Sequence, residues 1–128
     1  WPGAVEEILR YDSPVQSTAR AALRDVTVDG DVVPAGSVVA LLLGGANRDP
    51  RRFPDPARFD VRRPEAREHL SFSAGIHYCL GAALARTEAV TVLQRLFERF
   101  EDLALAGPPV RRSTRTLHGY RSLPVTVT

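Results

Sequence analysis

The feature that most constrains this chain is a glycine-containing loop that ends in its only cysteine and leads directly into a long amphipathic helix. That helix must pack one face against a core, and Gly107-Pro108-Pro109 cannot continue it. Free N–H groups and the positive dipole end at the start of a helix stabilise a thiolate, which binds metal or attacks carbon. The position therefore suits Cys79 as a reactive or metal-binding group, although a lone cysteine taken without further context is more often a small buried hydrophobe. The apolar positions of the helix recur at helical spacing at Ala85, Ala89, Val92, Leu93, Leu96, Phe97 and Phe100.

The residues before this loop predict one helix and one small β element. Ala4 to Tyr11 are expected to be helical, with acidic residues early and Arg10 late, the order that complements the helix dipole. β-Branched residues from Val26 to Leu43 predict short strands joined by tight turns at Asp29-Gly30-Asp31 and at Pro34-Ala35-Gly36.

Two further segments complete the expected fold. Asn47 to Pro64 contain prolines and charges without helical or strand periodicity, which predicts an ordered, irregular meander. In the tail from Val110 to Thr128, the segments 114–117 and 124–128 on either side of Gly119 predict a terminal hairpin. A chain of 128 residues with 44% hydrophobic content can bury one modest core, so we expect one unit over residues 1–128. Its predicted fold class is mainly α with small β elements (α+β).

Composition argues against several classes of function. The 17 basic residues are all arginine and are scattered among 15 acids, whereas nucleic-acid binding favours a clustered basic face. One cysteine cannot form an internal disulfide. The longest apolar run, Val38 to Leu43, is far shorter than the ~20 residues that span a bilayer. We therefore expect a cytoplasmic protein with no nucleic-acid partner and no membrane span. The absence of methionine predicts that the translation start, with any targeting signal, lies upstream.

The cysteine loop carries a recognisable pattern. It resembles the haem-ligand signature of the cytochrome P450 family, Phe-x-x-Gly-x-His-x-Cys-x-Gly, and the residues after it look like the start of the family's proximal helix. Every fixed position is met, by Phe72, Gly75, His77, Cys79 and Gly81. The resemblance implies that Cys79 binds the iron of haem b, and that its thiolate donates electron density that favours O–O cleavage.

The resemblance also implies a role for each neighbour of Cys79. Gly75 permits the backbone turn beneath the porphyrin, and Gly81 lets the helix approach the haem. Phe72 is expected to shield the sulfur from water, and His77 to bind a haem propionate. Without the resemblance His77 is more often a satisfied loop residue, and a His-x-Cys pair supplies too few ligands for structural zinc. A cysteine nucleophile activated by His77 is a further alternative, with poor geometry for a base and no evident oxyanion donors.

Glu7 and Arg10 are three residues apart on the first predicted helix, a spacing that places both side chains on one face. Taken alone they form a surface ion pair worth roughly a few tenths of a kcal/mol. The sequence Glu-Ile-Leu-Arg resembles the family's Glu-x-x-Arg motif. That resemblance implies a buried, structural pair that locks the meander through a second arginine, here Arg58.

Further contacts with cofactor, substrate and partner follow from the same resemblance. Arg20 lies where relatives bind a haem propionate, since a guanidinium matches a carboxylate, and a surface arginine is the alternative. Two stretches match segments that line the family's substrate pocket, namely Val15, Gln16, Ser17, Leu117 and His118. An acidic ferredoxin or flavodoxin docks in relatives on the proximal side, and a solvated charged loop is the alternative there. The arginines on that side are Arg62, Arg63 and Arg67.

These observations predict the haem-thiolate part of a cytochrome P450 monooxygenase, about the last third of a family member. The intact parent is expected to insert one oxygen atom from O2 into a small organic substrate, with electrons from a ferredoxin or flavodoxin-type donor. The acid–alcohol pair and the distal wall that relatives carry upstream are not among these residues, so we expect this fragment to be inactive alone. The alternative is a non-catalytic remnant or interaction module that does not bind haem and tolerates Cys79→Ala.

Overall fold

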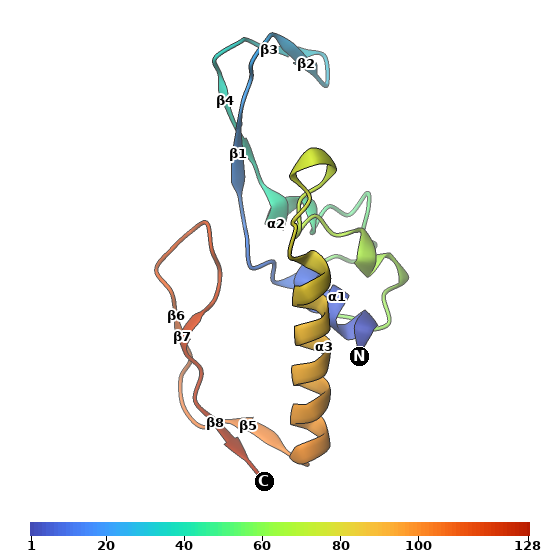
Figure 1. The fold of residues 1–128 in the computed structure, drawn as a ribbon, viewed down its shortest axis with the longest axis vertical. Coiled ribbons are helices and arrows are strands. Elements are labelled where there is room, and N and C mark those ends of the chain that lie inside the picture. The colour runs from blue at the N-terminus through green and yellow to red at the C-terminus, as the bar shows by residue number, and fades with distance from the viewer.

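The computed structural model describes residues 1–128 and shows helices joined to small two-stranded sheets (Figure 1). The helices are α1 (Pro2–Tyr11), α2 (Leu43–Ala46) and α3 (Ala82–Arg99), with 3-10 turns η1 (Pro64–Glu68) and η2 (Gly75–His77). The strands are β1 (Thr18–Ala21), β2 (Val26–Val28), β3 (Asp31–Val33), β4 (Val38–Leu41), β5 (Leu103–Leu105), β6 (Val110–Arg111), β7 (Tyr120–Ser122) and β8 (Val125–Val127). The predicted fold class, mainly helical with small β elements, is confirmed.

Both predicted helices are present, with shifted ends. Helix α1 begins two residues earlier than predicted because Pro2 occupies its first turn, where a missing N–H costs no hydrogen bond. Helix α3 follows Gly81 and ends at Arg99, well before the prolines. It ends there because Phe100 turns extended and the next residue, Glu101, donates its N–H to the carbonyl of Thr128 at 2.9 Å.

The first β element is a folded-over ribbon rather than a simple run of hairpins. Strands β2 and β3 form the predicted hairpin, and its turn residues Asp29 and Gly30 have φ of 51° and 91°, as a type I′ turn requires. Strand β4 pairs with β1 instead of β3. The prediction did not include β1, because Thr18–Ala21 is short and its partner lies 17 or more residues away in sequence.

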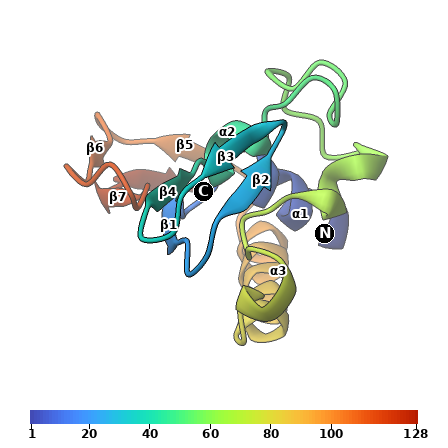
Figure 2. The same cartoon turned by 90° about the horizontal axis from the view of Figure 1, so that it is seen from above.

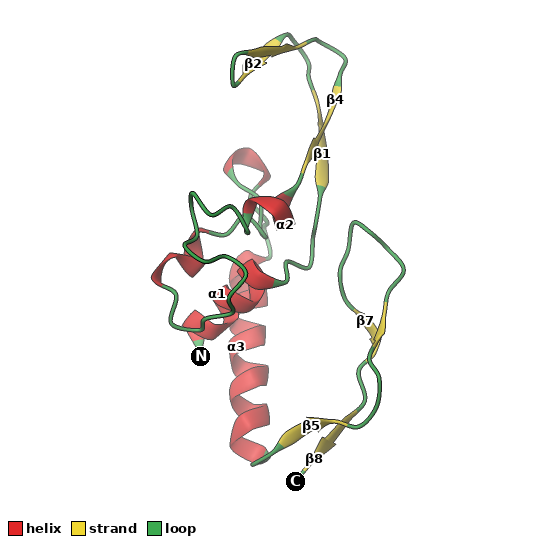
Figure 3. Cartoon of the chain, turned by 180° about the vertical axis from the view of Figure 1, so that it is seen from behind, coloured by secondary structure: helices red, strands yellow, loops and turns green.

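The predicted C-terminal hairpin around Gly119 is wrong in its pairing. Strand β8 pairs with β5, which directly follows α3, and β7 pairs with β6, so residues 103–127 form one long ribbon (Figure 3). Residues 114–117 form no strand of this ribbon, and Leu117 makes an isolated bridge to Val15 instead. Local turn signals could not reveal this pairing, because the partner of β8 lies on the far side of Gly107-Pro108-Pro109.

The ribbons stand away from the helices, and the chain buries little of its surface (Figures 1 and 2). Its exposed area is 9436 Å², whereas a compact protein of 14.0 kDa exposes about 6,700 Å². Twelve of the 128 residues are buried, and seven of these are polar or charged. On α3, Leu84 and Val92 remain 62% and 63% exposed. No helix here has the length and apolar character needed to cross a lipid bilayer.

Candidate cofactor site

Cys79 lies at a cavity of about 430 Å³ that the end of α1, strand β1, helix α2 and the cysteine loop enclose together. Four of the six residues predicted to bind a cofactor line it: Arg20, Phe72, His77 and Cys79. The remaining lining residues are Leu9, Pro14, Val15, Thr18, Leu43, Ser71 and Ser73. Residues separated by about 60 positions in sequence thus surround one largely apolar space.

The backbone conformation of the cysteine loop explains why residue 75 is glycine. Ser73 and Gly75 have φ of 62° and 61°, in the left-handed region that glycine occupies without strain. These two residues reverse the chain, so that the Cys79 N–H donates to the Phe72 carbonyl at 2.9 Å. Gly81 differs, because a Cβ there would meet only the Cys79 sulfur, at an ordinary 4.0 Å. Nothing within the chain itself therefore requires glycine at position 81.

The surroundings of Cys79 fit a metal that brings most of its own ligands. Its thiol is free and exposed, so Phe72 does not shield it within this chain. The chain holds no cluster of three histidine, cysteine or acidic residues, so Cys79 alone cannot complete a metal site. Ile76 and Leu80, on either side of it, are 98% and 103% exposed. A flat apolar group that carries a metal would cover both residues and receive the sulfur.

Two cationic or titratable side chains on this cavity have no acidic partner. The guanidinium of Arg20 donates only to the Ala19 carbonyl at 2.9 Å and to the hydroxyls of Thr18 and Ser73 at 3.3 and 3.4 Å. The His77 side chain forms neither a hydrogen bond nor an ion pair, although it lines the same space. Both are free to bind carboxylates of a cofactor, and haem fits this combination of one thiol, apolar walls and two anion-binding side chains.

The two predicted substrate-pocket stretches lie side by side. Val15 bridges Leu117, the Gln16 N–H donates to the Thr116 carbonyl at 2.8 Å, and the His118 N–H donates to the Pro14 carbonyl at 2.8 Å. Of the five residues, only Val15 lines the cavity, and Ser17 is half-buried beside it in sequence. The side chains of Gln16 and His118 are engaged elsewhere, with the Ser13 carbonyl and with Asp12.

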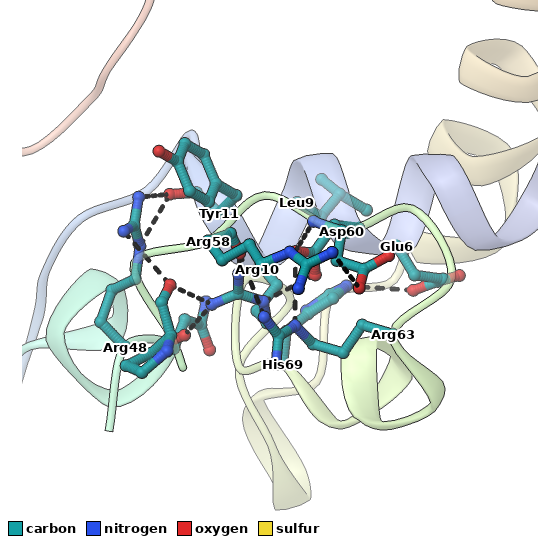
Figure 4. A network of polar contacts seen from close by, with 12 residues as sticks. Glu6, Leu9, Arg10, Tyr11, Arg48, Arg58, Asp60, Arg63 and His69 are labelled. Carbon is teal, nitrogen blue, oxygen red and sulfur yellow. Dashed lines mark hydrogen bonds and ion pairs between the residues drawn. The ribbon is translucent and has the colours of Figure 1, made fainter. Parts of the chain in front are cut away.

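Arg10 lies at the centre of a network of polar contacts (Figure 4). With Glu7 it forms a fully buried ion pair rather than a surface one. Arg10 Nε donates to Glu7 Oε2 at 2.7 Å and Arg10 Nη2 donates to Oε1 at 2.8 Å. The same guanidinium donates to the carbonyls of Asn47, Pro56 and Arg58 at 2.9, 3.1 and 3.3 Å. Arg10 thereby ties α1 to the start and the middle of the meander, which contains no helix or strand between Asn47 and Arg63, as predicted.

The prediction that Arg58 is the second arginine of this lock is wrong, and Arg63 takes that place. The Arg58 side chain is 69% exposed and reaches only Asp60 at 3.9 Å. Arg63 is 6% exposed, and its Nε donates to Glu7 Oε1 at 3.4 Å. A turn in which the Arg63 N–H donates to the Asp60 carbonyl at 2.9 Å directs this later arginine back onto Glu7. Arg63 is therefore unavailable for a docking partner, while Arg62 and Arg67 remain exposed.

The charges around Glu7 keep it ionised. Burial alone would raise the pKa of Glu7, but hydrogen bonds from Arg10, the Asp60 N–H and Arg63 outweigh it, so the pKa lies below its ordinary value. All polar side-chain atoms that are buried have hydrogen-bond partners. The lock is thus a satisfied network. Asn47, whose carbonyl accepts from Arg10, also accepts the Leu70 N–H at 2.6 Å, just before the cysteine loop begins.

A second cluster, made by the buried Glu6 and His69 and the half-buried Arg86, was not predicted. Glu6 precedes the recognised glutamate, and in sequence it looks like one of two adjacent surface acids. Its burial, at 6% exposure, follows from the packing of α1 between η1 and α3. No local pattern reveals that a carboxylate 80 residues before Arg86 meets it.

The comparisons with known proteins agree with this geometry. The family model described as "Cytochrome P450" matches residues 2–118. "Putative cytochrome P450 140" of Mycobacterium tuberculosis is 58% identical over 127 residues, which covers 99% of this chain and 29% of that protein. "Cytochrome P450 monooxygenase PikC" of Streptomyces venezuelae is 49% identical, over 96% of this chain and 30% of that protein.

Solved structures give the same result. The structure of P450BioI in complex with hexadec-9Z-enoic acid ligated acyl carrier protein superposes with a TM-score of 0.94 at 44% identity, over 99% of this chain and 33% of that one. Substrate-free CYP150A6 of Mycobacterium marinum superposes with a TM-score of 0.94 at 43% identity, over 99% of this chain and 34% of that one. Fold and sequence thus match one portion of bacterial cytochrome P450 chains. The chain belongs to the cytochrome P450 family, and it spans about three-tenths of the length of the curated relatives that it matches.

Proposed function

We propose that this chain forms the haem-thiolate site of a monooxygenase, with Cys79 as the ligand of haem iron. The observation that carries this proposal is the cavity that places the lone thiol beside Arg20 and His77, two side chains without acidic partners. Family membership supports a monooxygenase, since relatives include a protein named monooxygenase and one named hydroxylase. When bound, haem b supplies the activation of O2 and the transfer of one oxygen atom to a small organic substrate.

The residues of this chain divide the work of holding that cofactor. Cys79 binds the iron from a loop whose shape is fixed by the left-handed Gly75. Arg20 and His77 bind the propionates at the rim, where a guanidinium matches a carboxylate. Gly81 keeps the start of α3 free of a side chain on the side of the Cys79 sulfur, which would leave room there for the porphyrin.

Different segments of the chain would serve the substrate and the electron donor. We assign the substrate side to the paired stretches that join Val15 to Leu117, with Gln16, Ser17 and His118 beside them. Arg62 and Arg67 remain exposed to steer an acidic ferredoxin or flavodoxin-type donor, at a rate that decreases with added salt.

We also propose that the 128 residues alone do not turn over substrate. Exposed apolar residues flank Cys79, and the chain exposes about 2,700 Å² more than a compact protein of its mass. Water would therefore reach a cofactor bound to this chain. Access of water promotes side reactions that compete with transfer of oxygen to the substrate.

The proposal is tested with the full-length protein that carries this chain. Haem per polypeptide is measured after purification, and O2 consumption is followed with an acidic ferredoxin, its reductase and reduced nicotinamide. We expect a haem-loaded protein whose O2 consumption is abolished in Cys79→Ala and retained in Ser122→Ala, a small exposed residue on β7. Haem-free protein, or equal O2 consumption by Cys79→Ala, would refute the proposal and identify a remnant that does not use haem.

A further inference from the structure

The Glu6–His69–Arg86 cluster joins three separate elements beneath the cysteine loop. Arg86 of α3 forms a forked pair with Glu6 of α1, with Nε to Oε1 at 2.7 Å and Nη2 to Oε2 at 3.2 Å. His69, which follows η1, places Nε2 at 3.1 Å from Glu6 Oε2. The side chains of His69 and Glu6 are 1% and 8% exposed. Glu6 therefore orients the Arg86 guanidinium, and His69 in turn holds the Glu6 carboxylate.

The same guanidinium contacts the cysteine loop at both of its ends. Its carbon lies 4.6 Å from the centre of the Phe72 ring, and its Nη1 donates to the Tyr78 hydroxyl at 2.9 Å. Phe72 and Tyr78 bracket the loop, since Tyr78 precedes Cys79 and the Cys79 N–H donates to the Phe72 carbonyl at 2.9 Å. Arg86 therefore contacts both segments of the loop, the one at Phe72 and the one at Tyr78 and Cys79. The hydrogen bond between these segments sets the position of the cysteine backbone.

The arrangement is suited to arginine rather than to lysine. Only a planar guanidinium can fork onto a carboxylate, stack on an aromatic ring and donate to a hydroxyl at the same time. The His69 ring is oriented as well, because its Nδ1 accepts the Ser71 N–H at 3.1 Å and leaves Nε2 to donate to Glu6. The cluster has a fixed tautomer and few rotameric alternatives, as a rigid support for a metal ligand needs.

We propose that Arg86, held by Glu6 and His69, is a positioning residue for the Cys79 thiolate. It acts through Phe72 and Tyr78, and it keeps the sulfur at the height and direction that iron binding requires. This inference rests on the proposed haem-thiolate function and adds residues to it that the sequence motifs do not contain.

Another arginine provides the matched control. Arg48 lies 3.8 Å from the centre of the Tyr11 ring and donates to the Tyr11 carbonyl at 2.6 and 3.1 Å. It is half-buried like Arg86, but it connects α1 to the meander and touches no residue of the cysteine loop. Loss of Arg48 should therefore lower stability without moving the sulfur.

The experiment uses the full-length haem protein with the substitutions Arg86→Gln, Arg86→Lys, Tyr78→Phe and Arg48→Gln. The absorption spectrum of the reduced, carbon monoxide-bound protein reports whether a thiolate ligates the iron, and transfer of haem to apomyoglobin reports its dissociation rate. We expect Arg86→Gln to convert much of the red-shifted Soret band to the unshifted form and to speed haem loss about 10-fold. Arg86→Lys and Tyr78→Phe should change both readouts in the same direction by less, and Arg48→Gln should leave the band unchanged.

The outcomes distinguish failure of the positioning role of Arg86 from failure of the proposed haem-thiolate function. A wild-type protein without the red-shifted band would overturn both. A normal wild-type band that stays unchanged in Arg86→Gln and Tyr78→Phe would overturn the positioning role and leave haem-thiolate function intact. An equal change in Arg48→Gln would also overturn it, since the effect would then be general destabilisation. If Arg86→Gln fails to fold, Tyr78→Phe decides, because it removes one hydroxyl and leaves the Glu6 pair in place.

Discussion

Arg63, rather than Arg58, completes the buried network around Glu7 and Arg10, and this assignment yields a paired prediction. Replacing Arg63 by alanine should destabilise the full-length protein substantially, whereas replacing Arg58 by alanine should change little. The two residues are five positions apart on the same segment and have the same charge, so the comparison removes any effect of net charge. Only the geometry around Glu7 distinguishes them.

The structure sets the size of the difference. Arg63 donates to Glu7, to the Asp55 and Arg58 carbonyls at 3.0 Å each, and to the Pro54 carbonyl. Hydrogen bonds to charged groups contribute about 1.5–3 kcal/mol each when buried, but the carbonyls would regain water, so we expect a loss of about 2–3 kcal/mol. The exposed Arg58–Asp60 pair, at 3.9 Å, contributes at most ~0.5 kcal/mol.

Urea unfolding followed by far-ultraviolet circular dichroism measures both variants under identical conditions. The midpoint for Arg63→Ala should fall clearly below that of the wild type, with an unchanged slope, and the midpoint for Arg58→Ala should coincide with it. An equal or larger effect of Arg58→Ala would refute the assignment of Arg63 to the lock.

Two further predictions concern the loop and its support. Gly75→Ala should lower the free energy of unfolding by about 1–2 kcal/mol, because φ at this residue is 61°. Gly81→Ala should be nearly neutral in the haem-free protein, because φ there is an ordinary −85°. Urea unfolding midpoints of the two variants measure the difference. Burial lowers the pKa of His69 below its ordinary 6.5, so the unfolded chain binds more protons than the folded one below that pH and stability falls as pH decreases. His69→Gln should flatten this part of the stability curve, measured between pH 7 and pH 5. Equal midpoints for the two glycine variants, or an unchanged acid slope in His69→Gln, would contradict these predictions.

Short-range patterns predicted most of the elements that position the site. Helix α3 follows from apolar residues at helical spacing, and the β2–β3 hairpin follows from Asp29-Gly30 between β-branched residues. The loop that directly precedes α3, together with Cys79, was predicted from a motif of ten positions. Each of these signals lies within a few residues of the structure that it determines.

The features that the sequence did not reveal depend on contacts between distant residues. The pairing of β8 with β5, and of β1 with β4, is decided by where the intervening chain returns. Arg58 and Arg63 have the same local chemistry, and only the turn at Asp60 decides which one reaches Glu7. Glu6 appears in sequence as a surface acid, and its burial depends on α3, which lies 76 or more residues further along the chain.

The most direct test of the account is the absorption spectrum of the full-length protein, reduced under carbon monoxide, for the wild type and for Cys79→Ser. The account predicts a strongly red-shifted Soret band in the wild type, because thiolate ligation by Cys79 produces it, and its loss in Cys79→Ser at an unchanged helical content. A red-shifted band that survives in Cys79→Ser, or its absence from haem-loaded wild-type protein, would contradict the assignment of Cys79 as the iron ligand.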